Sequence, residues 1–376
     1  MLTGILNSGF GHSVRFIALT EHLRKHSNIT VNCLAPQCMK KYLSENISQY
    51  GCKLYNLNHL LYLSNNMNHK KKVILSKDKK IIQHLKRTSV VMNDFITQTH
   101  LLNHLFENQT IFCSLYHGDI TVNKYDSHKT TSFKKTIVNT VNNYDIFFHI
   151  NIQKPKEQPK MKCMYIPIPI ISRQISTSAE KVKSALGLAP DEHFILVHAG
   201  SAVMENVYKD LYKFYEAVNH LKTDYRIVIS STLENNNYPF NKYIIKAPLF
   251  YNGIDLVNAS DLVISKPGMG ILQDCIATKK PLLFLPGDFA ERTLKVRLLN
   301  EILNGNLPVI NTISTNSLKE AIMNCIHIKH IYEEGYSKIP TNGAEILAKS
   351  LLLLLNMKKE RIRDNFHLFQ EINPFM

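Results

Sequence analysis

A glycine-rich turn that ends in a histidine lies near the start of the chain, at residues 7–12 (NSGFGH). Gly9 and Gly11 let another molecule approach the backbone closely, and the helix expected to start here favours negative charge. They therefore form a candidate loop for a phosphate or an acceptor molecule. His12 is a candidate general base for a hydroxyl group, because histidine is the side chain that most often takes up protons in catalysis. In the alternative interpretation, His12 has no role in chemistry and is only a helix cap or a solvated side chain.

A second candidate for proton chemistry is Asp119, in residues 116–119 (YHGD) just after a predicted strand at residues 111–115. Carboxyl ends of parallel strands share one edge of a sheet, so Asp119 is expected near His12. There it could hold the imidazole in one tautomer and stabilise the imidazolium. His117 is a further candidate for handling protons. In the alternative interpretation, Asp119 only caps the next turn.

The most informative segment is residues 259–303, which predicts a strand, a glycine-bearing loop and a helix in succession. The loop is residues 265–270 (SKPGMG), and the backbone N–H groups of Gly268, Met269 and Gly270 are expected to hold a diphosphate against the helix dipole. A buried strand is expected next, and residues 286–292 (PGDFAER) follow it. Glu291 opens the next helix and can accept both hydroxyls of a ribose. A glutamate that only caps this helix is the alternative.

Cationic side chains near this segment are candidates for neutralising a leaving diphosphate: Lys266, Arg292 and Arg297. The sequence has no DxD motif, so neither a metal nor another cofactor is expected. NAD is not expected either, because the first glycine turn lacks the third glycine of a dinucleotide fingerprint and no acidic residue ends the next strand.

Short apolar runs alternate with longer amphipathic ones through both halves, which indicates βαβ units and two parallel α/β domains. Residues 153–160 (QKPKEQPK) hold two prolines and no large apolar residue, as a linker does. We expect an acceptor-binding domain at residues 1–155 and a donor-binding domain at 161–357. A C-terminal helix at 358–376 is expected to return to the first domain.

Residues 259–303 resemble the donor-binding region of GT-B glycosyltransferases, most closely the family 28 group that includes the lipid II N-acetylglucosaminyl transferase. The run 259–265 (ASDLVIS), the Gly-x-Gly loop and the later acidic residue carry this likeness. Gly9, Gly11 and His12 match the family's first glycine loop. Residues 198–201 (HAGS) match the turn that opens its second domain, which places Gly200 and Ser201 near the diphosphate. The resemblance implies two Rossmann-like doubly wound domains facing a central cleft.

Some positions depart from the family pattern. Ile271 stands where a threonine or serine hydroxyl usually donates to phosphate, and residues 273–274 (QD) replace a glutamate. No Gln/Asn pair that reads the donor sugar follows Glu291. The sequence therefore leaves the sugar unspecified.

The resemblance implies transfer of a sugar from a nucleoside diphosphate sugar, with UDP favoured, to an acceptor hydroxyl. The expected reaction is inverting and metal-independent, with His12 as the base. A nucleotide-sugar hydrolase or epimerase on the same scaffold is the first alternative, and a non-catalytic binding protein is the second.

The formal net charge is +15, and residues 1–155 hold 19 Lys and Arg against 8 Asp and Glu. Such a surface favours an anionic or lipid-linked acceptor, unless the lysines are merely solvated. Residues 70–87, from Lys70 to Arg87, predict a basic amphipathic helix for contact with an anionic membrane, or an ordinary surface helix. No nucleic-acid motif is present, and nucleic acid is not an expected partner. Seven scattered cysteines favour a cytoplasmic protein, peripheral at the inner membrane surface if the helix binds lipid.

Overall fold

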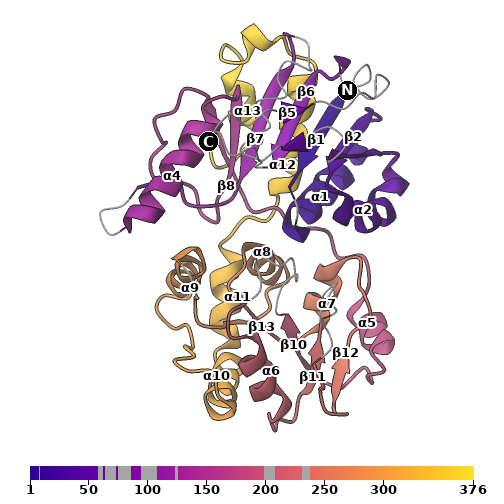
Figure 1. Ribbon diagram of the computed structural model, residues 1–376, viewed down its shortest axis with the longest axis vertical. Helices are drawn as coiled ribbons and strands as arrows, with labels where there is room; N and C mark the ends of the chain where they lie inside the picture. Colours follow the sequence, from indigo (N-terminus) through magenta and orange to yellow (C-terminus); the bar gives the residue numbers. More distant parts are fainter. Residues whose placement is uncertain are drawn as a thin grey trace. The chain divides into compact units, whose positions relative to one another are not determined.

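The computed structural model describes residues 1–7, 9–57, 62–63, 73–74, 86–94, 108–122, 126–198, 208–230, 238–288 and 290–376. The chain forms two compact units. The first contains Met1–Ile171 and Asn342–Met376, and the second contains Ser172–Thr341. Each unit has a parallel sheet flanked by helices (Figure 1). The predicted α/β class is therefore confirmed.

The first unit is built on a seven-stranded parallel sheet in the order β3-β2-β1-β6-β7-β8-β9. Most of these strands are buried along their whole length, as expected for a parallel sheet covered on both faces. Their bounds are β1 (Leu2–Leu6), β2 (Val31–Ala35), β3 (Lys53–Asn56), β6 (Val90–Asp94), β7 (Ile111–Tyr116), β8 (Ile146–Ile150) and β9 (Met164–Ile168). A short antiparallel pair, β4 (Tyr62–Leu63) and β5 (Val73–Ile74), stands apart from this sheet.

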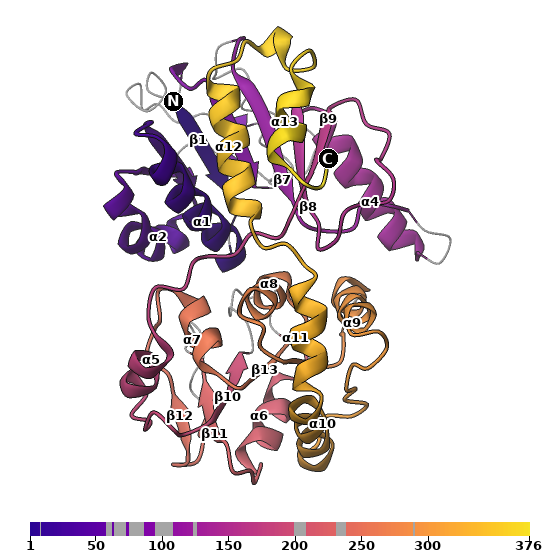
Figure 2. The ribbon, with the colours of Figure 1, turned by 180° about the vertical axis from the view of Figure 1, so that it is seen from behind.

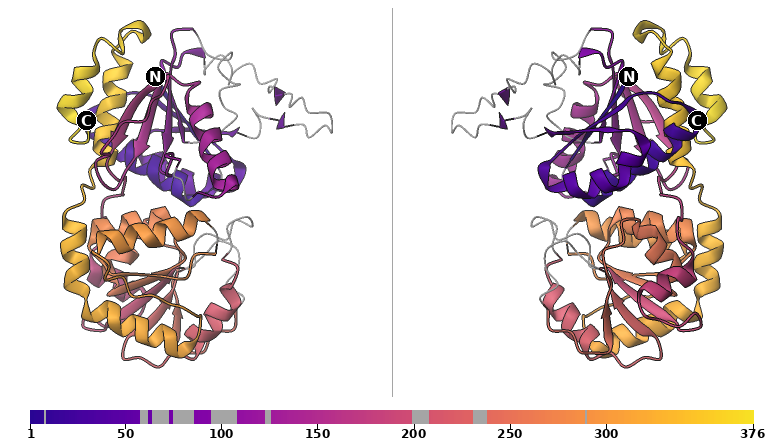
Figure 3. Two further views of the ribbon diagram at one scale, coloured as in Figure 1. Left: turned by 90° about the vertical axis from the view of Figure 1, so that its left-hand side faces the viewer. Right: turned by 90° about the vertical axis from the view of Figure 1, so that its right-hand side faces the viewer.

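The helices of the first unit come from both ends of the chain. They are α1 (Phe10–His26), α2 (Lys40–Ile47), α4 (His128–Val141), α12 (Gly343–Leu355) and α13 (Phe366–Ile372), with short 3-10 turns at Gln37–Met39, Ser48–Tyr50 and Lys359–Arg361. Helix α12 packs against α1, and Figure 2 shows the two side by side. Figure 3 shows the C-terminal helices and α4 on opposite faces of the sheet.

The unit boundaries differ from those expected at residues 155–161 and 358. Strand β9 pairs with β8 and completes the first sheet, so the first unit continues to Ile171. The chain then returns at Asn342, because the apolar face of α12 packs on α1 in the first unit. Gly343 makes this return possible: a Cβ atom there would lie 2.1 Å from the carbonyl oxygen of Pro169.

The second unit has a five-stranded parallel sheet in the order β12-β11-β10-β13-β14. Its strands are β10 (Phe194–His198), β11 (Arg226–Ile229), β12 (Ile244–Lys246), β13 (Leu262–Ser265) and β14 (Leu282–Phe284). Its helices are α5 (Ala179–Ala185), α6 (Leu211–Asn219), α7 (Gly253–Ala259), α8 (Met269–Thr278), α9 (Ala290–Ile302), α10 (Thr315–His327) and α11 (Lys329–Ser337). The central strand β10 pairs with β11 and β13, so these three strands end together at one edge.

Most of the basic segment 70–87 lies outside the described residues. Residues 73–74 belong to strand β5, which differs from the helix expected there. Of the helices that the structure describes, none has the length and apolar character needed to cross a bilayer.

Replacing Gly343 by alanine is expected to lower the free energy of unfolding by about 1–3 kcal/mol, because the added methyl group meets backbone that cannot move cheaply. Urea unfolding followed by circular dichroism measures this change. Gly253→Ala is the matched control, since a Cβ atom at that helix start meets nothing within 4 Å. Equal stability of the two variants would contradict the packing described for α12.

Candidate functional site

His12 stands at the carboxyl edge of the first sheet, where β1 ends and α1 begins. Gly9 forms the N-cap of α1 with φ 139°, a backbone conformation that residues other than glycine rarely adopt. The neighbouring strand β6 pairs with β1 in a register that sets Asp94 beside Leu6. The last residue of β6 therefore lies at the edge from which α1 starts.

The side chains of His12, Arg15 and Asp94 form a compact cluster at this edge. The guanidinium of Arg15 donates from Nε to Oδ2 of Asp94 at 2.9 Å and from Nη2 to Oδ1 at 2.8 Å. The imidazole Nδ1 of His12 lies 2.9 Å from that same Oδ1. Arg15 and Asp94 have side chains 4% and 1% exposed, whereas the side chain of His12 is 20% exposed. The imidazole is thus the member of the cluster that solvent or a ligand can reach.

Asp94 is a buried carboxylate that stays ionised. Burial by itself would raise its pKa, but the charges of Arg15 and His12 and their hydrogen bonds lower the pKa of Asp94 well below its ordinary value. A fixed negative charge therefore stands beside the imidazole. Such a charge can orient a histidine base and stabilise the imidazolium that forms when the base takes a proton.

Asp119 does not contact His12. Its carboxylate accepts from the ammonium of Lys134 at 2.6 Å and from the backbone N–H of Thr121 at 2.8 Å. The nearby His149 is buried, which lowers its pKa to about 4, and it bonds to the carbonyl oxygen of Gly118 at 2.8 Å. These bonds hold the 118–121 turn in place. The carboxylate beside His12 is Asp94 instead of the expected Asp119, and His117 lies stacked on Tyr116.

Sequence reasoning missed Asp94 because strand β6 was not recognised. The signal was present in residues 90–92 (VVM), a short β-branched apolar run that follows the polar residues 88–89 (TS). The basic segment at residues 70–87 was predicted to be a helix, and the strand that follows it was therefore overlooked. Only the sheet order, with β6 next to β1, brings Asp94 to His12.

In the second unit, the predicted glycine loop joins β13 to α8. Gly268 is the N-cap of α8 with ordinary extended backbone, and Gly270 is the second residue of the helix. A Cβ atom at Gly268 would meet only ordinary contacts, and one at Gly270 would meet nothing within 4 Å. Neither backbone conformation nor packing thus requires glycine here, although glycine in a helix costs up to about 1 kcal/mol relative to alanine. Within the part of the chain that the structure describes, nothing crowds these two glycines at the start of α8.

Several cationic side chains lie near this helix start. Arg292 on α9 bonds Asp288 at 2.6 Å, and both side chains are 4% exposed. Burial lowers the pKa of Lys266 to about 8, and the charges of Arg292 and Lys295 lower it further while that of Asp288 opposes them. The charges of Arg292 and Lys295 therefore act on Lys266, and such a group of cations favours an anion. Sequence reasoning identified Lys266 and Arg292 but missed Lys295, which follows Arg292 by one helical turn.

Arg297 differs from its expected role. Its side chain is 65% exposed and pairs with Glu301 on the same helix at 3.7 Å. It therefore belongs to the solvent-facing side of α9. Glu291 falls within α9, but its side chain lies outside the described residues, as do Gly200 and Ser201.

Polar bonds connect the ends of the three central strands of this sheet. The Nδ1 of His198 lies 2.9 Å from the hydroxyl oxygen of Ser230, and the hydroxyl of Ser265 donates to the carbonyl oxygen of His198 at 2.7 Å. Burial, with the charge of Lys266, lowers the pKa of His198 to about 4. His198 is therefore neutral at pH 7, and it links the ends of the neighbouring strands through Ser230 and Ser265.

Asp274 is a further titratable group on α8, one turn after Gly270 and so on a similar face of the helix. Burial raises its pKa to about 7, although the charge of Arg173 partly opposes this effect. A carboxyl group with a raised pKa near a glycine loop is typical of functional sites. Asp274 is therefore a candidate hydroxyl-binding group that the sequence analysis did not identify.

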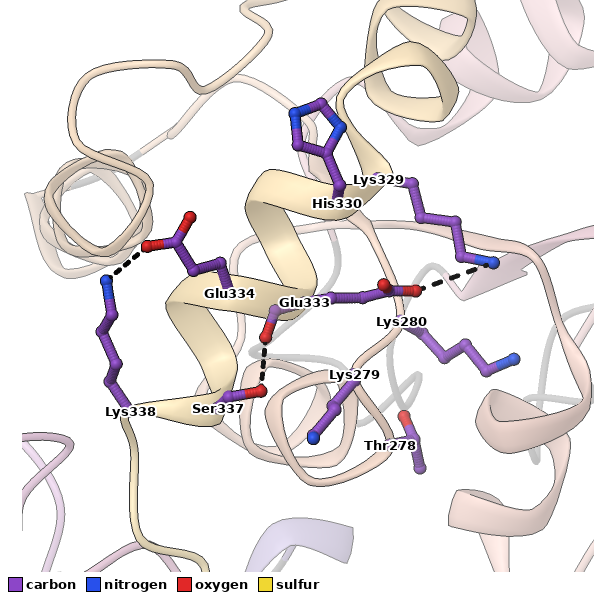
Figure 4. A pocket seen from close by; sticks show the side chains of 9 residues that line it. All are labelled: Thr278, Lys279, Lys280, Lys329, His330, Glu333, Glu334, Ser337 and Lys338. Atoms are coloured by element: carbon purple, nitrogen blue, oxygen red, sulfur yellow. Dashed lines mark hydrogen bonds and ion pairs between the residues drawn. The ribbon is translucent and has the colours of Figure 1, made fainter.

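An open hollow of about 610 Å³ lies at the opposite, carboxyl end of α8 (Figure 4). It is lined by four lysines and by residues of α11: Thr278, Lys279, Lys280, Lys329, His330, Glu333, Glu334, Ser337 and Lys338. In it Lys329 pairs with Glu333 and Lys338 with Glu334. This hollow is separate from the glycine loop, which stands at the other end of the helix.

Comparison with solved structures identifies the fold. The chain is similar to Arabidopsis thaliana UGT89C1, solved in complex with UDP, at 11% identity and a TM-score of 0.64 over 95% of this chain and 99% of that one. It is similar to a Polygonum tinctorium UDP-glucosyltransferase at 10% identity and 0.62 over 95% and 98%. Acinetobacter baumannii MurG matches at 14% identity and 0.54 over 95% and 99%. No protein-family model and no curated protein sequence matches the chain. The chain has the GT-B fold, as the resemblance implied.

Replacing Asp274 by asparagine is expected to flatten the pH dependence of stability. The carboxyl group has a folded-state pKa near 7 and an ordinary unfolded value, so stability falls as pH rises from about 4 to 7 and stays reduced above 7. Asp274→Asn removes this loss and gains about 1 kcal/mol at pH 8, with no gain at pH 3.5. Urea unfolding at both pH values measures it. A gain of equal size at both would refute the assigned pKa shift.

Proposed function

We propose that this chain is a glycosyltransferase that moves a sugar from a nucleoside diphosphate sugar to an acceptor hydroxyl. The observation that carries the proposal is the group of cations beside the open start of α8 in the second unit. Cationic side chains next to backbone N–H groups suit the diphosphate of a donor, and they would also stabilise the diphosphate that leaves. UDP is the favoured nucleotide, since the similar UGT89C1 was solved with UDP.

In this proposal, each unit has a distinct task. The second unit binds the donor through Gly268, Gly270 and the side chains of Lys266, Arg292 and Lys295, while Asp274 or Glu291 accepts ribose hydroxyls. The first unit supplies the base: His12 takes the proton of the acceptor hydroxyl, and Asp94 stabilises the resulting imidazolium.

The bonds of the reaction balance as a direct displacement. The acceptor oxygen forms a bond to the anomeric carbon while the bond from that carbon to the β-phosphate oxygen breaks. The acceptor proton moves to the imidazole, and the electron pair leaves with the nucleoside diphosphate. Displacement from the opposite face inverts the anomeric centre, and protein cations meet the leaving charge in place of a metal.

The basic composition of residues 1–155 supports an anionic or lipid-linked acceptor for the proposed enzyme. Attraction between this basic surface and the anionic groups of an acceptor would raise the local concentration of the acceptor. The proposed place of action is the cytoplasm, at the inner membrane surface if the acceptor is a lipid.

A panel of UDP, GDP, TDP, CDP and ADP tests the donor site. One of them is expected to raise the melting temperature, because a ligand of the native state stabilises it by mass action. Lys266→Gln is expected to weaken binding of that nucleotide at least tenfold, as measured by titration calorimetry. Arg297→Gln is the matched control, because that cation is exposed and paired with Glu301. Absence of a shift with all five nucleotides would remove the donor site from the proposal.

His12→Ala is expected to lower kcat by about 10²-fold or more with little change in nucleotide affinity, as loss of a general base does. Release of nucleoside diphosphate from the matching nucleotide sugar, with a mixture of hydroxyl acceptors, measures turnover. His26→Ala, exposed at the end of the same helix, serves as the control. Normal turnover in His12→Ala would eliminate this histidine as the base, and free sugar formed without any acceptor would indicate a hydrolase.

A further inference from the structure

The three side chains at the edge of the first sheet form a triangle of close contacts. The imidazole Nδ1 of His12 lies 2.9 Å from Oδ1 of Asp94 and also 2.9 Å from Nη2 of Arg15, and these two atoms lie 2.8 Å from each other. One neighbour of Nδ1 accepts hydrogen bonds and the other donates them. The geometry therefore allows two tautomers of the imidazole.

The two tautomers have opposite consequences for chemistry. If Nδ1 carries the hydrogen, it donates to Oδ1 of Asp94, and Nε2 has a free lone pair that can take a proton. If Nδ1 is bare, it accepts from Nη2 of Arg15, and Nε2 carries the hydrogen. An imidazole in that second state has no lone pair to offer a hydroxyl group. The tautomer thus decides whether His12 can act as a base.

The charge of Asp94 favours the first tautomer, although the second hydrogen of Arg15 Nη2 also lies within reach of Nδ1. The guanidinium donates from Nε and Nη2 to both oxygens of Asp94, in the parallel fork that arginine and carboxylate prefer. This fork fixes the carboxylate plane, and Oδ1 stays within reach of Nδ1. The carboxylate bears a full negative charge in a site 1% exposed, so a hydrogen bond from Nδ1–H to it is charge-assisted.

We propose that Arg15 is a positioning residue that selects the Nδ1–H tautomer of His12 by fixing the carboxylate of Asp94. The inference rests on the proposed function, in which His12 is the base. Arg15 does not touch the substrate and acts through Asp94. The imidazolium that forms on proton transfer then meets an oriented, ionised oxygen of Asp94 at Nδ1.

A lysine cannot replace this arrangement. It keeps the positive charge that a buried Asp94 needs, but it is a compact point charge without the two parallel donors of the fork. Arg15→Lys is therefore the informative variant, since it retains charge compensation and loses orientation. Arg24→Lys, on the same helix and outside the triangle, is the matched control.

The experiment is ¹⁵N NMR of the histidine rings, with His12 assigned by loss of its signals in His12→Ala. The expected result is the Nδ1–H tautomer in the wild type and in Arg24→Lys, and a mixture of both tautomers in Arg15→Lys. In parallel, Arg15→Lys is expected to lower kcat roughly 10- to 100-fold while leaving the KM of the donor unchanged. Circular dichroism verifies that each variant is folded.

Two results would overturn the inference: a wild-type His12 in the Nε2–H tautomer, or an Arg15→Lys variant with an unchanged tautomer. The tautomer is measured without substrate, so it is independent of catalysis. A wild-type Nδ1–H tautomer that shifts in Arg15→Lys, together with a fully active His12→Ala variant, would support the positioning role and defeat the proposed base. The failure of each claim is therefore recognised separately.

Discussion

Both sheets are parallel and covered by helices, and this constraint decides where polar chemistry can occur. Strands such as β1, β6 and β13 are buried along their whole length, so a charged side chain within them would have no access to water. Polar groups gather where a strand ends and a helix begins. His12 with Asp94 in the first unit, and Lys266 with the glycine loop in the second, obey the same rule.

The carboxyl edges of the two sheets carry different arrangements of charge, and each arrangement suits a different chemical task. In the first unit, a forked ion pair is neutral as a whole and places one carboxylate oxygen against an imidazole. In the second unit, the charges of Arg292, Asp288 and Lys295 act on Lys266, and burial lowers the pKa of Lys266 to about 8. The first arrangement suits the transfer of a proton, and the second suits the binding and release of an anion. Together they match the two tasks of the proposed sugar transfer.

Local motifs made much of this architecture predictable from the sequence. Gly9, Gly11 and His12, and the loop from Lys266 to Gly270, are each contiguous in the chain, and the periodic runs around them predicted parallel α/β units. Features that depend on distant pairing were not predictable in this way. Asp94 reaches His12 because β6 pairs with β1, and residues 342–376 join the first unit through contacts with distant segments, such as the packing of α12 on α1.

Two kinds of error illustrate the limit of spacing arguments. Asp119 follows a correctly predicted strand, but its carboxylate pairs with Lys134 on α4. No sequence pattern predicts this partner. Arg297 follows Arg292 by five residues and so faces a different side of α9, where it pairs with Glu301. Lys295 lies three residues after Arg292, so helical geometry places the two side chains on the same face of α9.

In the proposed reaction, a nucleoside diphosphate sugar donates its sugar by direct displacement. Proton NMR of nucleotide sugars incubated with the protein and hydroxyl acceptors follows both products at once. The account predicts that a nucleoside diphosphate and a glycoside appear in equal amounts, and that the anomeric configuration of the glycoside is inverted relative to the donor. A glycoside of retained configuration, or no consumption of any nucleotide sugar, would contradict it.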